Sequence, residues 1–194
     1  MRRQFFQCEL RVQSNFHKFS VVLLTAILPF CNIAQVLPNR PIETSQLEPL
    51  IGTWITERES LSRNGEWIKS DTKGIWNFEW GLKGHAIIDT YELLHKDQFG
   101  KDSVDFSGIN VRIFDPKEAI WKVTWVENVG RNFAHFTAKV VDGRIEMEGV
   151  NPAGRDVKVF FYEVKKDSFL WRLEWSFDDG KSWVAISRMK CSRI

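Results

Sequence analysis

The chain has 194 residues, 13% of them aromatic, with 27 basic and 25 acidic residues and a formal net charge of +2. Residues 1–34, interpreted below as an export signal, hold four of the basic residues and one of the acidic residues. The remaining 160 residues suffice for one domain and carry 23 basic and 24 acidic residues, a formal charge of −1. Such a near-neutral domain lacks the excess positive charge expected of a protein that binds nucleic acid or an anionic membrane surface.

The beginning of the chain is predicted to be a signal peptide. Most of the charged residues in 2–18 are basic. The uncharged stretch from Phe19 to Phe30 that follows is too short to span a bilayer, which needs about 20 residues. A basic segment followed by a short apolar one is typical of secretion, and we place cleavage after Ala34. We therefore expect a periplasmic or extracellular protein with no transmembrane segment once mature. Acylation of Cys31 is an alternative that the bulky Phe30 disfavours.

The mature chain is expected to begin with a linker and one short helix. Residues 35–44 hold two prolines and show no periodicity, so they are predicted to form a linker. Ser45 and Glu48 match a capping box at a helix start, and Gly52 limits that helix to a turn or two. The domain is placed at 45–194. Cys191 is the one cysteine left after cleavage, so no internal disulfide can form.

Short strand-like segments separated by turn residues fill the rest of the domain. Turns are indicated by Asp142-Gly143, Asn151-Pro152-Ala153-Gly154 and similar groups. About 8–10 short strands of this kind predict an antiparallel barrel or sandwich. The first candidate is 53–57, and the strand-sized segments that follow it are 66–70, 74–81, 85–95, 105–114, 119–127, 133–141, 144–150, 157–164, 168–177 and 182–190.

A five-residue pattern, Trp-x-x-x-Trp, occurs three times in these strands. On a β-strand, alternate side chains share one face, so each copy places two indoles and the apolar residue between them on the same side. The pattern therefore predicts an aromatic wall. The six tryptophans are Trp76, Trp80, Trp121, Trp125, Trp171 and Trp175.

Two hairpins can be placed in register from their turns. Asp142-Gly143 indicates a two-residue type I′ turn, which pairs Phe136 with Gly149 and turns His135 outward. The same register puts Glu146 and Glu148 on a solvated face.

The Asp179-Gly180 hairpin allows two registers. One sets Trp171 opposite Arg188 and Leu173 opposite Ile186. The other sets Trp183 opposite Trp175, and the sequence does not choose between them.

The order of short motifs resembles the lipocalin-like (calycin) proteins. The segment from Leu47 to Trp54 resembles a short helix followed by Gly-x-Trp at the first barrel strand. The chain is most similar to an uncharacterised bacterial lipocalin-like family with a Gly-Thr-Trp start, a central Asp-Pro hairpin and a late turn like that at 176–183. This resemblance implies a calycin barrel, and the family carries no established catalytic residues that could be transferred to this chain. It also implies an arginine packed across Trp54, for which Arg188 is the candidate.

No pattern of residues indicates a reaction. Signatures of nucleophilic catalysis, phosphate binding and metal binding are absent, so no catalytic residue, cofactor or metal ligand is assigned. Asp89 lies in an apolar segment and shares a strand face with Tyr91. A buried carboxylate needs a partner, and we expect Arg112 to provide it.

Three interpretations of the tryptophans remain open. They could fill the barrel as core, line a pocket for a small hydrophobic molecule, or form an outward platform for sugar rings. We favour non-catalytic binding of a small hydrophobic ligand, with Arg112 or Asp89 as a polar contact. A carbohydrate-binding or accessory module is the alternative, and a small-molecule hydrolase stays open. The sequence does not predict an oligomeric state.

Overall fold

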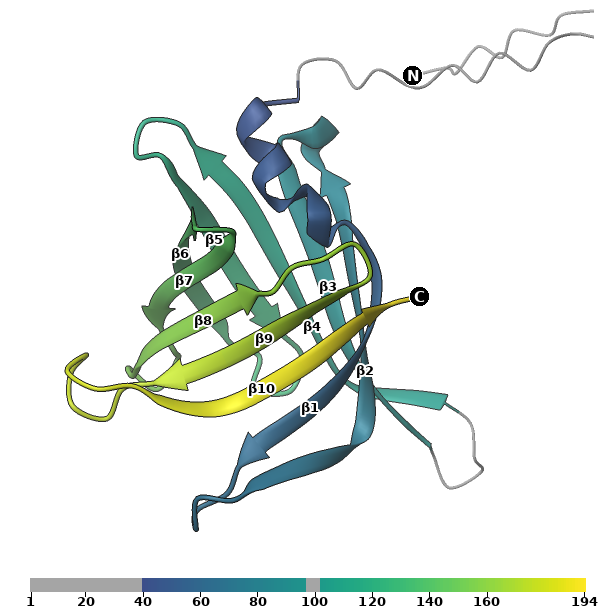
Figure 1. The fold of residues 1–194 in the computed structure, drawn as a ribbon, viewed down its shortest axis with the longest axis vertical. Helices are drawn as coiled ribbons and strands as arrows, with labels where there is room; N and C mark the ends of the chain where they lie inside the picture. The colour runs from purple at the N-terminus through teal and green to yellow at the C-terminus, as the bar shows by residue number, and fades with distance from the viewer. Residues whose placement is uncertain (1–39, 97–101) are drawn as a thin grey trace, which may run out of the picture. The chain divides into compact units, whose positions relative to one another are not determined.

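The computed structural model describes residues 40–96 and 102–194, which form one closed antiparallel barrel (Figure 1). Each strand pairs with its neighbours in chain order, and β1 closes the barrel by pairing with β10. The predicted all-β barrel is confirmed. The strands are β1 (Gly52–Leu61), β2 (Trp67–Gly81), β3 (Ala86–Lys96), β4 (Asp102–Asp115), β5 (Ile120–Glu127), β6 (Phe133–Val141), β7 (Arg144–Val150), β8 (Asp156–Tyr162), β9 (Ser168–Trp175) and β10 (Val184–Arg193).

Two predicted strands, 66–70 and 74–81, are a single long strand, β2. The residues between them, Asp71 to Lys73, contain neither Gly nor Pro, so nothing there breaks the extended chain. The predicted signal peptide, its cleavage after Ala34 and acylation of Cys31 all lie outside the described residues. Within the described part of the chain, no helix is long and apolar enough to cross a membrane.

A 3-10 helix, η1 (Ile42–Leu50), precedes the barrel. It begins three residues earlier than predicted, within the expected linker, and Ser45 is not its cap. The Ser45 hydroxyl instead donates to the carbonyl of Ile42 inside the helix. Leu47 and Leu50 are each 1% exposed, and η1 lies at the end of the barrel where β1 begins (Figure 1). The helix therefore closes that end.

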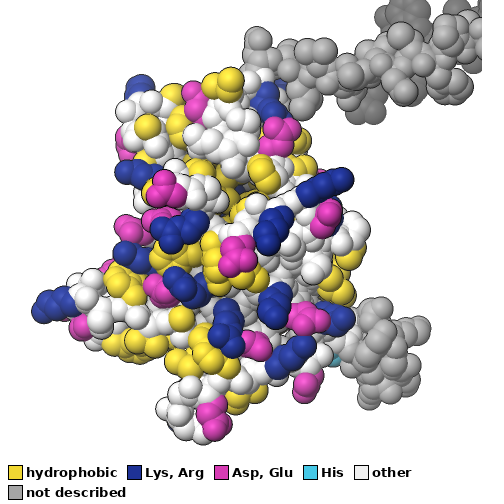
Figure 2. Space-filling view, viewed as in Figure 1, with side chains coloured by type: hydrophobic (Ala, Val, Ile, Leu, Met, Phe, Trp, Pro, Cys, Tyr) yellow, Lys and Arg dark blue, Asp and Glu magenta, His cyan; other side chains and the backbone are white. Residues whose placement is uncertain are grey.

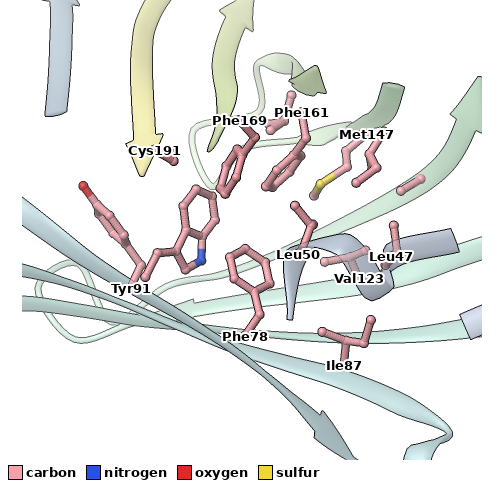
Figure 3. Close-up of a cluster of buried hydrophobic side chains, with 14 of the residues drawn as sticks. Leu47, Leu50, Phe78, Ile87, Tyr91, Val123, Met147, Phe161, Phe169 and Cys191 are labelled. Carbon is pink, nitrogen blue, oxygen red and sulfur yellow. The ribbon is translucent and has the colours of Figure 1, made fainter. Parts of the chain in front are cut away.

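The core lies under η1. Phe78, Phe161 and Phe169 come from three different strands and pack with centroids 5.7 to 6.4 Å apart. Figure 3 shows these rings turned toward one another, with Leu50 of η1 nearby. Cys191 is also buried in this cluster, and burial raises the pKa of its thiol well above the ordinary value. The closed end is thus filled by side chains.

The arginine that covers Trp54 is Arg193, with its guanidinium 4.0 Å from the ring centroid. The predicted contact between Arg188 and Trp54 is wrong, because Arg188 points outward, lies over Trp67 and pairs with Glu59. Arg193 is five residues further along β10, on its inward-facing side, and is the residue registered with Trp54.

Arg193 also fastens the helix end to the barrel by donating to the carbonyls of Pro49 and Ile51. At Gly52, φ is +129°, and an added Cβ would approach the Arg193 guanidinium to 2.2 Å. The positive φ therefore requires glycine as the first residue of the Gly-Thr-Trp motif, and the lack of a side chain leaves room for the Arg193 guanidinium.

The hairpin at Asp142-Gly143 has the predicted register, with Phe136 opposite Gly149. Both central residues have positive φ, as a type I′ turn requires. In the last hairpin neither expected register occurs. Val184 is opposite Trp175, and the register shifts between Ala185 and Ser187 because of a bulge that the sequence does not mark.

Charged side chains of both signs are interspersed over the face shown in Figure 2. Several of them form pairs on the outer surface, including Arg144 with Glu146 and Lys158 with Glu148. Glu146 and Glu148 are therefore solvated surface residues, as predicted.

Candidate functional site

A cavity of ≈ 310 Å³ opens inside the barrel, at the end opposite η1. Trp125 and Trp175 lie near the ends of β5 and β9, and Asn151 and Pro152 come from the connection between β7 and β8. Trp125, Trp171 and Trp175 are half-buried, so the cavity reaches solvent at this end. The barrel is therefore filled at one end and hollow at the other.

Four of the six predicted tryptophans line this cavity, namely Trp76, Trp125, Trp171 and Trp175. All six face the barrel interior, as strand parity predicts. The remaining two lie toward η1: the indole of Trp121 donates to Gln46 of the helix, and Arg40 lies over the ring of Trp80. Two residues four apart on a strand are separated by about 13 Å. The first two copies of the pattern therefore span both the filled and the hollow parts of the barrel, whereas both tryptophans of the third copy line the cavity.

The wall of the cavity is mostly aromatic and aliphatic. Phe106 stacks on Trp125 with an interplanar angle of 24°, and Trp76 meets Trp171 edge to face. At Gly108 an added Cβ would lie 2.1 Å from the Trp125 ring, so glycine lets this indole lie flat on β4. Alanine, valine, leucine, methionine and proline side chains complete the apolar wall: Ala134, Val157, Val159, Leu173, Met147, Met189 and Pro152.

Behind the wall, Asp89 forms the centre of a buried polar network. Its carboxylate is 0% exposed and accepts three hydrogen bonds from side chains of the two neighbouring strands, β2 and β4. The Trp76 indole donates to Oδ1 at 2.7 Å, the Asn110 amide donates to Oδ1 at 2.9 Å, and Arg112 Nε donates to Oδ2 at 2.6 Å. This network fixes one cavity indole and satisfies the buried carboxylate.

Arg112 is the partner expected for Asp89, and it also lines the cavity. Its side chain is 2% exposed and is flanked by the rings of Phe78 and Phe161. Nη1 donates to the thioether of Met147 at 3.2 Å, a weak acceptor. Asp89 does not itself line the cavity. Of the two predicted polar contacts, Arg112 can therefore meet a ligand, whereas Asp89 orients Arg112.

Four polar residues of the cavity were not predicted: Arg58, Tyr91, Asn110 and Asn151. Arg58 lies on β1 and shares the inward face with Trp54 and Thr56. Tyr91 forms a 3.4 Å hydrogen bond with Thr56, and burial raises its pKa, partly offset by that bond and by the charge of Arg58. Counting alternate residues from Trp54 would have placed Arg58 inside.

A second hollow of ≈ 370 Å³ lies among mostly outward-facing side chains of β1, β2, β8, β9 and β10. Four of the five charged residues that line it are in ion pairs. Lys69 Nζ donates to Glu57 at 2.8 Å, which lowers the pKa of Glu57 and raises that of Lys69. Arg188 pairs with Glu59 at the same place. Side chains that are engaged in ion pairs with one another are not free to bind a ligand. We therefore assign the candidate ligand-binding site to the interior cavity.

The histidines of the described chain do not come together. His135 points outward and contacts the Thr124 hydroxyl at 3.1 Å, and His95 lies near Asp105. Among residues 40–96 and 102–194, no group of three or more His, Cys, Asp or Glu could hold a metal ion.

Comparison with known proteins supports the fold. No protein-family model and no curated protein sequence matches the chain. Among solved structures, the S-type phycobiliprotein lyase CPES from Guillardia theta aligns over 80% of this chain and 97% of its own, with a TM-score of 0.51 and 12% identity. Rv2717c from M. tuberculosis aligns over 80% of this chain and 99% of its own, with a TM-score of 0.54 and 12% identity. These likenesses concern the fold alone, which is that of a lipocalin-like barrel.

Proposed function

We propose that this barrel binds a small hydrophobic molecule in its cavity and does not catalyse a reaction on it. The observation that carries the proposal is the hollow end itself, lined by four indoles and a largely apolar wall. Its volume is near the lower bound of ~300 Å³ typical of small-molecule sites. That is room for about ten water molecules at ~30 Å³ each, or for a ligand of two or three rings.

The structure weighs against the other two interpretations of the tryptophans. The six indoles face inward, so they do not form the outward platform expected for a carbohydrate-binding module. They also do not fill the barrel, because four of them surround the cavity. A fold shared at 12% identity with a protein named a lyase transfers no activity to this chain.

Export belongs to the same proposal. It is supported by the basic segment and the short apolar segment within residues 2–30. The Gly-Thr-Trp start supports kinship with bacterial lipocalin-like barrels.

Tryptophan fluorescence tests the proposal with N-phenyl-1-naphthylamine, a neutral apolar probe that fluoresces in apolar surroundings. Because four indoles line the cavity, the probe should quench tryptophan emission saturably and gain fluorescence by energy transfer. Soluble cello-oligosaccharides should leave the emission unchanged. Emission that is insensitive to the probe at high micromolar concentration, or that responds to the glycans alone, would contradict binding in the cavity.

A further inference from the structure

The cavity has an uncompensated positive charge. Arg58 and Arg112 are its two charged lining residues, and no Asp or Glu is among the described residues that line it. The charge of Arg112 is matched by Asp89 at 2.6 Å. Arg58 forms no ion pair and donates no hydrogen bond within residues 40–96 and 102–194, and its Nε is buried.

The acidic residues beside Arg58 in sequence cannot supply the missing partner. Glu57 and Glu59 lie on the opposite face of β1, because side chains alternate along a strand. Each is engaged outside the barrel, Glu57 with Lys69 and Glu59 with Arg188. Arg58 therefore lies alone between two outward-facing carboxylates.

The backbone at this point is irregular. The pairing of β1 with β2 shifts register between Glu57 and Glu59, which places Arg58 directly opposite a β-bulge. Bulges re-aim side chains and occur next to functional sites. Arg58 lines the cavity without an ion-pair partner among the described residues, and an acceptor from a ligand would reduce the cost of holding its charge partly buried there.

We propose that the ligand is an amphiphilic anion, with a carboxylate or similar oxyanion bound by Arg58 and an apolar body held among the indoles. The proposal rests on the proposed function and adds the charge of the ligand to it. Tyr91 lies beside Arg58 in the same wall and offers its hydroxyl as a second donor. Arg112 is paired with Asp89 and flanked by the rings of Phe78 and Phe161, so the anionic group is assigned to Arg58.

Two probes with one shared skeleton test this inference. 8-Anilinonaphthalene-1-sulfonate is N-phenyl-1-naphthylamine with an added sulfonate, so the pair differs in the anionic group alone. We expect Arg58→Gln to weaken binding of the sulfonate about tenfold, the effect of one hydrogen bond to a charged group. The affinity for the neutral probe should stay unchanged, which also shows that the variant is folded. Arg58→Lys should restore part of the lost affinity.

Arg188→Gln is the matched control, because Arg188 lies on the adjacent strand and points outward. It should change neither affinity. Equal loss of both probes in Arg58→Gln, or no loss of the sulfonate, overturns the inference and leaves cavity binding standing. Failure of both probes to bind the unaltered protein overturns the proposed function as well.

Discussion

Replacement of Asp89 by Asn is expected to lower the free energy of unfolding by about 3 kcal/mol or more. The substitution keeps the side-chain size but leaves Arg112 charged in a position where its side chain is 2% exposed. Removing one partner of a buried ion pair typically costs ~3–5 kcal/mol, because the other charge is then uncompensated. Urea unfolding followed by circular dichroism measures the change.

Two further variants separate the effect of charge from that of lost packing. Glu59→Gln removes the partner of Arg188 from a half-exposed pair and should cost less than about 1 kcal/mol. Asp89→Asn combined with Arg112→Met removes both charges and should recover part of the lost stability, as apolar replacements of buried pairs often do. A single-variant loss below about 1 kcal/mol would show that Asp89 and Arg112 are not a buried pair.

Replacement of Ala134 by Phe is expected to abolish most binding of N-phenyl-1-naphthylamine. Ala134 lines the cavity and is 5% exposed, so the added ring must enter the hollow. A ligand would then compete with it for space, and overpacking of ~1–3 kcal/mol corresponds to a loss of about ten- to a hundredfold in affinity. The dissociation constant from probe fluorescence measures this loss.

Thr137→Phe provides the control for that substitution. Thr137 is on the same strand, β6, but points to solvent, so the same ring is added outside the barrel. Affinity for the probe should be retained. Unchanged affinity in Ala134→Phe would show that the probe binds elsewhere.

The strands and the inward direction of the tryptophans could be predicted because both follow from local chemistry. Turn residues mark the chain reversals, and alternation along a strand fixes which side chains share a face. The same reasoning correctly placed Asp89 inside with Arg112 and turned His135 outward.

Turn residues and strand alternation could not predict how far along the barrel axis each residue lies. Parity does not tell Trp80, which lies toward η1, from Trp76, which lines the cavity. Because Arg188 points outward, Arg193 is the arginine that lies over Trp54. The bulge in β10, which shifts the register of the last hairpin, could not be predicted from the sequence either. Arg58 was missed because its neighbours on both sides are charged, which hides the alternation that would mark it as inward.

The most direct test of ligand binding in the barrel uses methyl-¹³C methionine. The two methionines of the described chain, Met147 and Met189, both line the cavity, on β7 and β10. During titration with N-phenyl-1-naphthylamine, both methyl resonances should move and saturate at one equivalent of bound probe, with ring-current shifts from the naphthyl group. Methyl resonances that stay in place while the probe's fluorescence saturates would place the binding site outside the cavity and contradict the proposed function.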